Sequence, residues 1–577
     1  MNLLPFAVLL IAPQVDRDVA VPMRDGLALR ADVFKPEGNG RFPTLVYRTP
    51  YDRKHAAEDY TTVTAAVDRG YAVVVQDVRG RHGSAGEFEP YRNEGKDGYD
   101  TIEWAAAQAW SNGKVGTFGL SYPGAVQWLA AVEAPPHLEA MVPAMTFSTA
   151  RNFIYSGGVF DLSWTSWIYE NISADVRVKK GLPGPKTVAE AEATWARLRP
   201  DVDRRLPLSD LPEFRDVAPY LFDWMKRPPG DPTWNWMEIR GKYDRVRAAV
   251  LNLSGWYDGA YGTEGAATNH NGLVAARRGG PSRSSLVIGP WVHGSATMNA
   301  RHGQVKAGHR AFAATAAIDY DGLILRFMDH YLRSVDNGVD REPPVRAFVM
   351  GEDVWRDEAS WPPATAQPLT LYLRGGGANA VAARRLDAAP PDEASATSRF
   401  VSDPLDPVTD PFALAPGAHD YRDLPKRRDV VLFDTAPLAN DLRVLGPITA
   451  EVHVSTDGRD TDLWLKLFDV AEDGTAWNLM SPGLDGLRAS YRRGGPAREL
   501  LEPGHVYPLS LDSMLTGNLF KKGHRLRLVV CSTFFPHYSR NLHTGGLETE
   551  EKAARKAEIR IHHDRAHPSS LRLSVVP

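Results

Sequence analysis

The first 149 residues alternate buried-strand patterns with helical ones. Residues 44–48 (TLVYR) and 72–78 (AVVVQDV) are β-branched apolar runs without polar alternation, which is typical of parallel strands covered on both faces. Helical patterns lie between and after them, at residues 59–70 and 98–108. Strands that alternate with helices in this way predict βαβ units, and therefore a doubly wound α/β sheet.

Residues 150–243 have a different pattern, helical and rich in tryptophan, in which we expect no strands. Helices are predicted at residues 187–198 and 219–227, between Pro-rich breaks. Strand patterns return at residues 248–255 and 284–290, so the helical segment is inserted within the α/β domain. Because an aromatic-rich helical insertion usually caps a site, we interpret this segment as a helical cap.

The last third of the chain consists of short alternating strands separated by turns, with almost no helical periodicity. This pattern predicts an antiparallel β-sandwich and fits a jelly roll. The chain is therefore predicted to have four parts: the first part of an α/β domain (1–149), a helical cap (150–243), the second part of the α/β domain (244–360) and a jelly-roll β-sandwich (361–577).

A serine marks the junction of a strand pattern and a helix pattern in GTFGLSYPGAVQWLAA, residues 116–131. Ser121 is on the turn, and Gly119 and Gly124 stand where a side chain would collide with the neighbouring element. A strand, a tight turn with serine at its apex and a helix describe a nucleophile elbow. The usual pattern is G-x-S-x-G, whereas here Pro123 replaces the second glycine, so the motif alone also fits an ordinary turn.

A serine nucleophile needs a histidine base, and the histidine needs a carboxylate to hold it. In an α/β-hydrolase sheet these groups follow later strands, in the order Ser, acid, His. Asp258 in LNLSGWYDGAYG and His293 in LVIGPWVHGS each come just after a predicted strand. Either residue alone also fits a structural role in a turn or loop, but together with Ser121 they predict a catalytic triad.

The reaction also needs donors for the oxyanion of the tetrahedral intermediate. We expect the backbone N–H of Tyr122, which follows the nucleophile, to be one of them. Tyr51, in VYRTPYDRK after an early strand, is a candidate for the second donor, although its chemistry equally fits an ordinary loop aromatic. Trp164 and Trp167 in the cap either line an acyl pocket or pack the cap core, and lining is the interpretation we favour.

Composition narrows the class of protein. There are 67 Lys and Arg residues against 71 Asp and Glu, a net charge of −4, which gives no electrostatic footprint for nucleic acid or an anionic membrane. A single cysteine, Cys531, excludes an internal disulfide.

The apolar residues 1–14 are too short to span a bilayer and lack a basic n-region, so we expect an arm or strand and a cytoplasmic location. The alternative is a secreted or periplasmic protein in which this stretch belongs to a signal peptide.

Several motifs together resemble the cocaine-esterase family, which is related to X-Pro dipeptidyl peptidases and α-amino acid ester hydrolases. They are RTPYDR, VVQDVRGRHGSAGEF, GLSYPG, GWYDG, GPWVHG and FVMGEDVWRDE, and the resemblance covers nearly the whole chain. It implies an α/β-hydrolase domain, a helical cap and a C-terminal jelly roll. It also implies that Ser121, Asp258 and His293 form the triad, and that the Tyr51 hydroxyl and the Tyr122 amide form the oxyanion hole.

The function expected is that of a serine hydrolase that cleaves carboxylic esters through an acyl-enzyme. Amides are left open as substrates, as is a homo-oligomer, and we expect a small-molecule substrate with no cofactor and no metal. One alternative is an X-Pro dipeptidyl peptidase or α-amino acid ester hydrolase, for which Asp161, Glu170 and Glu264 are candidates to hold a substrate ammonium group. Another is an inactive scaffold whose β-sandwich binds carbohydrate.

Two further pairs of residues receive structural interpretations. Asp77 and Arg79 are expected to form a salt bridge and turn near the site. His562 and His563 are adjacent in a strand pattern and should point to opposite faces, so the two cannot easily share a metal ion.

Overall fold

The computed structural model describes residues 14–299, 303–375 and 384–577. The expectation for residues 1–14, an arm or strand rather than a targeting signal, falls on a segment whose first 13 residues lie outside the described part. The cytoplasmic location likewise stays a prediction. Two compact units make up the fold: Met1–Pro143, Arg245–Val250 and Asp321–Asp340 form the first, and Ala144–Asp244, Leu251–Tyr320 and Arg341–Pro577 form the second.

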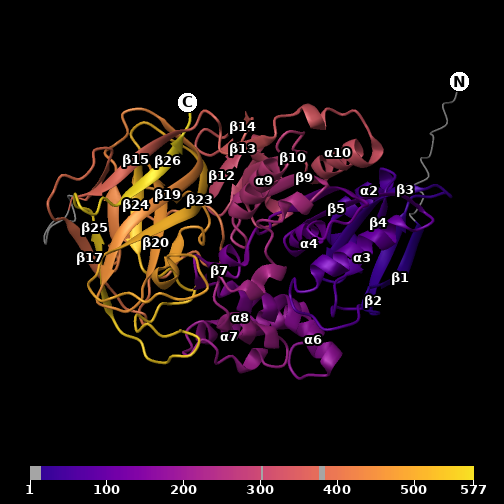
Figure 1. Ribbon diagram of the computed structural model, residues 1–577, viewed down its shortest axis with the longest axis horizontal. Coiled ribbons are helices and arrows are strands. Elements are labelled where there is room, and N and C mark those ends of the chain that lie inside the picture. Colours follow the sequence, from indigo (N-terminus) through magenta and orange to yellow (C-terminus); the bar gives the residue numbers. More distant parts are fainter. Residues whose placement is uncertain (1–13, 300–302, 376–383) are drawn as a thin grey trace. The chain divides into compact units, whose positions relative to one another are not determined.

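A sheet runs through the first unit, with its strands in the order β1-β2-β4-β3-β5-β6 (Figure 1). β3 pairs in parallel with both β4 and β5, whereas β2 pairs antiparallel with β4 and β1 with β2. β4 is buried along its whole length, as expected for a run of valines covered on both faces. The strands are β1 Gln14–Pro22, β2 Ala28–Lys35, β3 Phe42–Thr49, β4 Ala72–Asp77, β5 Ser111–Leu120 and β6 Leu138–Ala144.

Helices of the first unit follow its strands, as the βαβ pattern predicts. α3 and α4 contact both β3 and β5. α10 comes much later in the chain but joins the same unit, because Asp329 accepts a hydrogen bond from the hydroxyl of Tyr71 at 2.7 Å and pairs with Arg69 at 2.6 Å. The helices are α1 Ala56–Asp59, α2 Thr61–Asp68, α3 Glu94–Ala106, α4 Tyr122–Ala131 and α10 Tyr320–Arg333.

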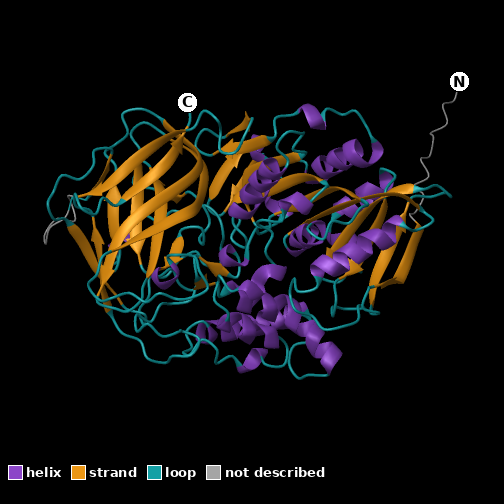
Figure 2. Ribbon diagram, viewed as in Figure 1, coloured by secondary structure: helices purple, strands orange, loops and turns teal. Residues whose placement is uncertain are grey.

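The second unit begins with the predicted helical segment, whose helices gather in one cluster (Figure 2). The expectation that it contains no strands is wrong, since Tyr155–Ser156 (β7) and Val159–Phe160 (β8) form a short antiparallel hairpin. Strands of two residues carry no periodicity by which a sequence reveals them. The helices are α5 Ser163–Trp167, a π-helical turn η2 Ile168–Ile172, α6 Ser173–Lys180, α7 Val188–Val202 and α8 Pro219–Lys226.

After this segment come the strands of the resumed α/β domain, in the order β9-β10-β13-β14. β10 and β13 are parallel, and β14 is an antiparallel edge strand. The connection from β9 to β10 contains one helix, as expected for a crossover. The elements are β9 Ala249–Tyr257, α9 Glu264–Ala276, β10 Ser284–Val292, β13 Val345–Val349 and β14 Val354–Glu358, with a hairpin of β11 Gln304–Ala307 and β12 Arg310–Ala313.

Among the described residues from 367 onward, twelve strands pack around an apolar core and are coloured salmon to yellow in Figure 1. The long strands pair antiparallel, β19 with β23, β25 and β26, and β20 with β24, as the alternating pattern predicts. The strands are β15 Gln367–Arg374, β16 Arg385–Asp387, β17 Thr397–Ser402, β18 Val431–Asp434, β19 Leu442–Thr456, β20 Asp462–Val470, β21 Ala476–Asn478, β22 Gly486–Arg488, β23 Tyr507–Phe520, β24 Arg525–Cys531, β25 Ala557–His562 and β26 Ser570–Val575.

The predicted four-part division stays a prediction, although the cuts between the two units at 143/144 and 244/245 lie close to the limits expected for the cap. Within the described ranges, no helix combines the length and the apolar composition that crossing a bilayer requires.

Candidate active site

The turn between β5 and α4 is strained at the serine. Ser121 has φ 70° and ψ −130°, a left-handed conformation that side chains other than glycine rarely adopt. A Cβ on Gly119 would lie only 2.5 Å from the Cβ of Pro123, so the close approach of the turn to its own helix requires glycine there. The carbonyl oxygen of Ser121 accepts hydrogen bonds from the N–H groups of Gly124 and Ala125, both at 2.9 Å. This geometry is that of a nucleophile elbow.

Tyr122, the residue after the serine, is anchored through its side chain. Its ring is fully buried, and its hydroxyl donates to Glu94 Oε1 at 2.8 Å while accepting from the N–H of Tyr91 at 3.0 Å. Glu94 in turn pairs with Arg48 at 2.8 Å. Burial raises the pKa of Tyr122 well above its usual range, so the phenol stays protonated. Because the phenol is committed to Glu94, the group of Tyr122 that suits an oxyanion is its backbone N–H.

Tyr51 follows β3, and its side chain is half-buried. Its N–H donates to Thr49 Oγ1 at 3.1 Å, which closes a turn at the end of the strand. The loop is tied down two residues later by Arg53, which is buried, pairs with Asp32 at 3.0 Å and also bonds Asp77. The end of β3 is therefore fixed to the sheet, and Tyr51 starts from a rigid base.

The expected salt bridge between Asp77 and Arg79 is not formed. Asp77 bonds Arg53, and Arg79 instead pairs with Asp97 at 2.6 Å and with Asp25 at 2.7 Å. Both residues are structural, as expected, but their partners come from other segments of the chain. Proximity in sequence misled the prediction, because Asp77 ends β4 whereas Arg79 lies in the turn that follows, where the alternation that puts i and i+2 on one face of a strand no longer holds.

In the second unit, Asp258 and His293 meet directly. Asp258 follows β9 and is fully buried, and its Oδ1 lies 2.8 Å from Nδ1 of His293, which follows β10. The same oxygen accepts the N–H groups of Ala260 at 3.1 Å and Tyr261 at 3.3 Å. An ionised carboxylate only accepts hydrogen bonds, so Nδ1 donates and Nε2 is left as the basic nitrogen. The pair therefore has the geometry of a carboxylate that orients a general base.

Close packing of β9 on β10 brings these two side chains together. A Cβ on Gly255 would lie 2.3 Å from the carbonyl oxygen of Trp291, so only glycine permits this approach. Ser481 also donates to the carbonyl oxygen of Asp258 at 2.8 Å and holds the loop from the opposite direction. Of the residues predicted for the site, Ser121, Tyr122 and Tyr51 belong to the first unit and Asp258 and His293 to the second.

A run of aromatic rings leads from the cap to His293. The ring of Tyr261 lies 5.6 Å from the imidazole of His293 and stacks on Phe153 at 4.5 Å. Phe153 in turn meets Trp164 edge-on at 4.8 Å, and Trp164 meets Trp167 at 5.4 Å. Trp164 is only 5% exposed, so much of it packs the cap core. Sequence reasoning missed Tyr261 and Phe153, for which the nearness of Tyr261 to Asp258 was the available signal.

Two of the three carboxylates considered for an ammonium group are already engaged. Glu264 bonds Arg240 and accepts the hydroxyl of Thr268 at 2.6 Å. Asp161 accepts the N–H of Ser163 at 2.8 Å and faces a cavity of about 20 Å³, which has room for about one water molecule. Burial raises the pKa of Asp161 to about 6. The third, Glu170, is half-buried at the π-helical turn.

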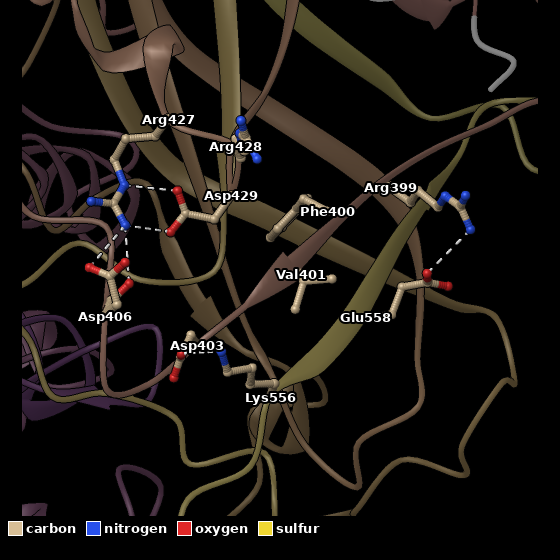
Figure 3. Close-up of a pocket in the computed structure, with 10 residues that line it drawn as sticks. All are labelled: Arg399, Phe400, Val401, Asp403, Asp406, Arg427, Arg428, Asp429, Lys556 and Glu558. Carbon is tan, nitrogen blue, oxygen red and sulfur yellow. Dashed lines mark hydrogen bonds and ion pairs between the residues drawn. The ribbon is translucent and has the colours of Figure 1, made fainter. Parts of the chain in front are cut away.

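The β-sandwich carries a groove of about 820 Å³ over β17 and β25 (Figure 3). Four cationic and four acidic side chains line it, so their charges balance, and Lys556 pairs with Asp403 at 2.9 Å and Arg399 with Glu558 at 3.4 Å. The aromatic lining residue, Phe400, is only 4% exposed. The lining thus offers neither an aromatic platform nor a net charge to a sugar or an anion.

Comparisons with known proteins cover nearly the whole chain. The X-Pro dipeptidyl-peptidase (S15 family) model matches residues 25–295, and the X-Pro dipeptidyl-peptidase C-terminal non-catalytic domain matches residues 337–572. The cocaine esterase of Rhodococcus sp. (strain MB1 Bresler) is 33% identical over an alignment of 590 positions, which covers 97% of this chain and 98% of that protein. The chain belongs to the cocaine-esterase family. As a member of this family it is a hydrolase, and the resemblance inferred from its motifs is confirmed.

Solved structures agree on the fold of this cocaine-esterase family member. An aminopeptidase from a marine sediment archaeon, Thaumarchaeota archaeon, superposes with a TM-score of 0.81 at 23% identity, covering 100% of this chain and 98% of that one. An α-amino acid ester hydrolase superposes with a TM-score of 0.78 at 24% identity, with the same coverage. The predicted fold class, an α/β-hydrolase sheet with a C-terminal β-rich domain, is confirmed.

Proposed function

We propose that this protein is a serine hydrolase that cleaves carboxylic esters through an acyl-enzyme intermediate. The observation that carries the proposal is the 2.8 Å contact between the buried carboxylate of Asp258 and Nδ1 of His293. The strained turn at Ser121 supports it, because such a turn exposes a serine hydroxyl at the end of a helix. Similarity to a cocaine esterase supports an ester as the substrate.

In the proposed reaction, Nε2 of His293 takes the proton from Ser121 Oγ as that oxygen attacks the ester carbonyl carbon. Asp258 stabilises the imidazolium that results. The hydroxyl of Tyr51 and the N–H of Tyr122 donate hydrogen bonds to the negative oxygen of the tetrahedral intermediate. The imidazolium then gives its proton to the departing alkoxide, which leaves as an alcohol. A water molecule, deprotonated by the same nitrogen, attacks the acyl-enzyme and releases the carboxylic acid.

The aromatic run beside His293 supports an apolar acyl group. Tyr261 and Phe153 present stacked rings next to the imidazole, and aromatic side chains pack well against a flat ring or a compact alkyl group. We infer that esters of benzoic or phenylacetic type are cleaved faster than acetates of the same alcohol. Trp164 and Trp167 would contribute to this wall from the cap.

The test is covalent labelling with a fluorophosphonate together with hydrolysis of p-nitrophenyl esters. Both are expected to disappear in Ser121→Ala and to persist in Ser282→Ala, a matched control in the loop before β10. Turnover retained by Ser121→Ala would overturn the proposal. Circular dichroism of both variants separates loss of chemistry from loss of fold.

The relatives include an aminopeptidase as well as an α-amino acid ester hydrolase, so the test must also address ammonium recognition. Phenylglycine methyl ester and phenylacetate methyl ester differ only by the amino group. We expect similar kcat/KM values for the two, because Glu264 is neutralised by Arg240 and Asp161 faces a water-sized cavity. A preference of 100-fold or more for the amino ester, about 2.7 kcal/mol, would favour the alternative function.

A further inference from the structure

A group of histidines gathers around a carboxylate at one edge of the β-sandwich. His562 ends β25, and the turn that leads to β26 carries Asp564 and His567. On the neighbouring strand β19, His453 is paired directly with His562 in the antiparallel register. Side chains paired in this way project from the same face of a sheet, with Cβ atoms about 5 Å apart. The turn folds His567 toward both rings.

The spacing of the polar atoms fits a metal ion. His562, Asp564 and His567 each offer one ligand atom, and these three atoms lie within 4.8 Å of one another. His567 Nδ1 and Asp564 Oδ1 are 3.1 Å apart. Ligands at about 2.0–2.1 Å from a tetrahedral zinc ion are roughly 3.4 Å apart, so a pair at the 4.8 Å limit needs to close by about 1.4 Å.

The distances between the histidine rings also fit a metal ion. The centre of the His567 ring lies 5.5 Å from that of His453 and 5.4 Å from that of His562. Two imidazoles bound to one tetrahedral ion hold their centres roughly 5 Å apart. Nδ1 of His453 is buried and, among the residues that the structure describes, has no hydrogen-bond partner.

Neighbouring polar groups hold the Asp564 carboxylate and the backbone of the two paired histidines in position. The buried carboxylate of Asp564 accepts the N–H groups of Ala566 at 2.9 Å and of His567 at 3.1 Å. The hydroxyl of Ser569, also buried, donates to the carbonyl oxygen of His562 at 2.6 Å and accepts the N–H of His453 at 2.8 Å. The bonds to Asp564 are of the kind that fixes the orientation of a metal ligand, whereas those of Ser569 fix the backbone that carries His562 and His453.

We propose that His562, Asp564 and His567 bind one divalent transition-metal ion of the zinc type, with His453 or water in the fourth position. Imidazole nitrogens with one carboxylate suit zinc and its neighbours, whereas magnesium and calcium prefer sets made of oxygens. His562 and His567 are half-exposed, so an ion can reach them from solvent. The site lies in the β-sandwich, shares no residue with the proposed catalytic set, and does not depend on that proposal.

Adjacent His563 does not belong to this site. It is fully buried, and its Nε2 lies 3.0 Å from the hydroxyl of Ser398 on β17. The two adjacent histidines therefore have different partners, as their alternation along a strand requires. The expectation of no metal considered this pair alone and overlooked Asp564 and His567.

The test is a titration of the chelator-stripped full chain with Zn²⁺, by calorimetry and by competition with a chromogenic chelator. Wild type should bind one equivalent on the order of 1 μM or more tightly, a free energy near −8 kcal/mol. His567→Ala and Asp564→Asn should each weaken this binding by about 100-fold. His505→Ala, which removes an exposed histidine from the same β-sandwich, should bind as wild type does.

Two further measurements keep the result decisive. Thermal melting should show that Zn²⁺ raises the Tm of wild type but not of His567→Ala, and that the two melt alike without metal. Substitution with Co²⁺ should give the visible absorption of a tetrahedral site in wild type only. Equal zinc affinity in wild type and Asp564→Asn would overturn the proposal. Ester hydrolysis should be unchanged in every variant, so this test and that of the catalytic proposal can fail separately.

Discussion

The buried carboxylate of Asp258 holds the imidazole of His293 through a 2.8 Å hydrogen bond to Nδ1. If this bond sets the tautomer of a general base, Asp258→Asn should lower kcat for p-nitrophenyl esters by about 10⁴-fold, because an amide N–H can donate a hydrogen bond to Nδ1 and so favours the wrong tautomer. KM should change little. A kcat within tenfold of wild type, in a variant with an unchanged circular dichroism spectrum, would refute a role for Asp258 in orienting the base.

The variant Tyr51→Phe tests whether the hydroxyl of Tyr51 is the second donor to the oxyanion. Tyr51→Phe removes one hydroxyl from a half-buried ring at the end of β3 and should leave the fold intact. We expect kcat to fall by about 100-fold or more, the usual effect of losing one oxyanion donor, while fluorophosphonate labelling of Ser121 continues more slowly. Stopped-flow measurement of acylation is the appropriate assay. An unchanged acylation rate would assign Tyr51 to the loop alone.

Tyr122 should behave in the opposite way. Its hydroxyl is bonded to Glu94 in the interior, and the group assigned to catalysis is its backbone N–H. Tyr122→Phe should therefore change kcat by less than about tenfold but lower the free energy of unfolding by about 1–3 kcal/mol, since the buried carboxylate loses a donor. Urea denaturation measures the second quantity. A large loss of kcat with unchanged stability would mean that the phenol itself takes part in the reaction.

Acid should destabilise the fold partly through His270, a buried residue of α9 whose Nδ1 lies 3.0 Å from the hydroxyl of Ser284. Burial lowers the pKa of His270 from 6.5 to about 4. Well above pH 6.5 the ring is neutral in both the folded and the unfolded chain, so it adds no pH dependence to the stability. Between pH 6.5 and 4 only the unfolded chain takes up the proton, so stability falls as pH falls, by up to about 3 kcal/mol.

In the variant His270→Gln, the free energy of unfolding should fall less steeply between pH 6.5 and 4. Urea denaturation at pH 7, 6, 5 and 4.5 measures this dependence. His505→Gln, which replaces an exposed histidine, serves as the control and should leave the loss of stability in acid unchanged. An equal slope in His270→Gln and wild type would show that other groups govern the acid response. His543 and His563 are the first to examine then, because burial lowers the pKa of each to about 4.

Long elements with a clear period were predictable from the sequence. The valine run of β4 and the alternating strands of the β-sandwich were recognised because burial on one or both faces imposes a pattern on every residue. The β7–β8 hairpin was missed, since two residues cannot show a period. The partners of Asp77 and Arg79 were wrong because ion pairs depend on where distant segments meet, which local pattern does not encode.

For the site, the sequence revealed residue types that chemistry places at strand ends. Asp258 and His293 could be proposed because both follow strong strand signals, and the contact between them agrees with that reasoning. The position of the Tyr261 ring and the hydrogen bond between Tyr122 and Glu94 could not be found in the same way. Aromatic contacts and buried ion pairs such as Arg48 with Glu94 are set by packing across three elements, and the sequence shows each partner only as an ordinary residue.

The link from Arg48 through Glu94 to Tyr122 bears on how the protein is inactivated by heat. The hydroxyl of Tyr122, the residue after Ser121, is bonded to Glu94 of α3, which pairs with Arg48 of β3. The turn at Ser121 therefore keeps its conformation as long as these buried interactions are intact. On heating, turnover and the near-ultraviolet circular dichroism signal should therefore be lost over the same few degrees. The temperature at which activity is lost would then report the thermal unfolding of the sheet.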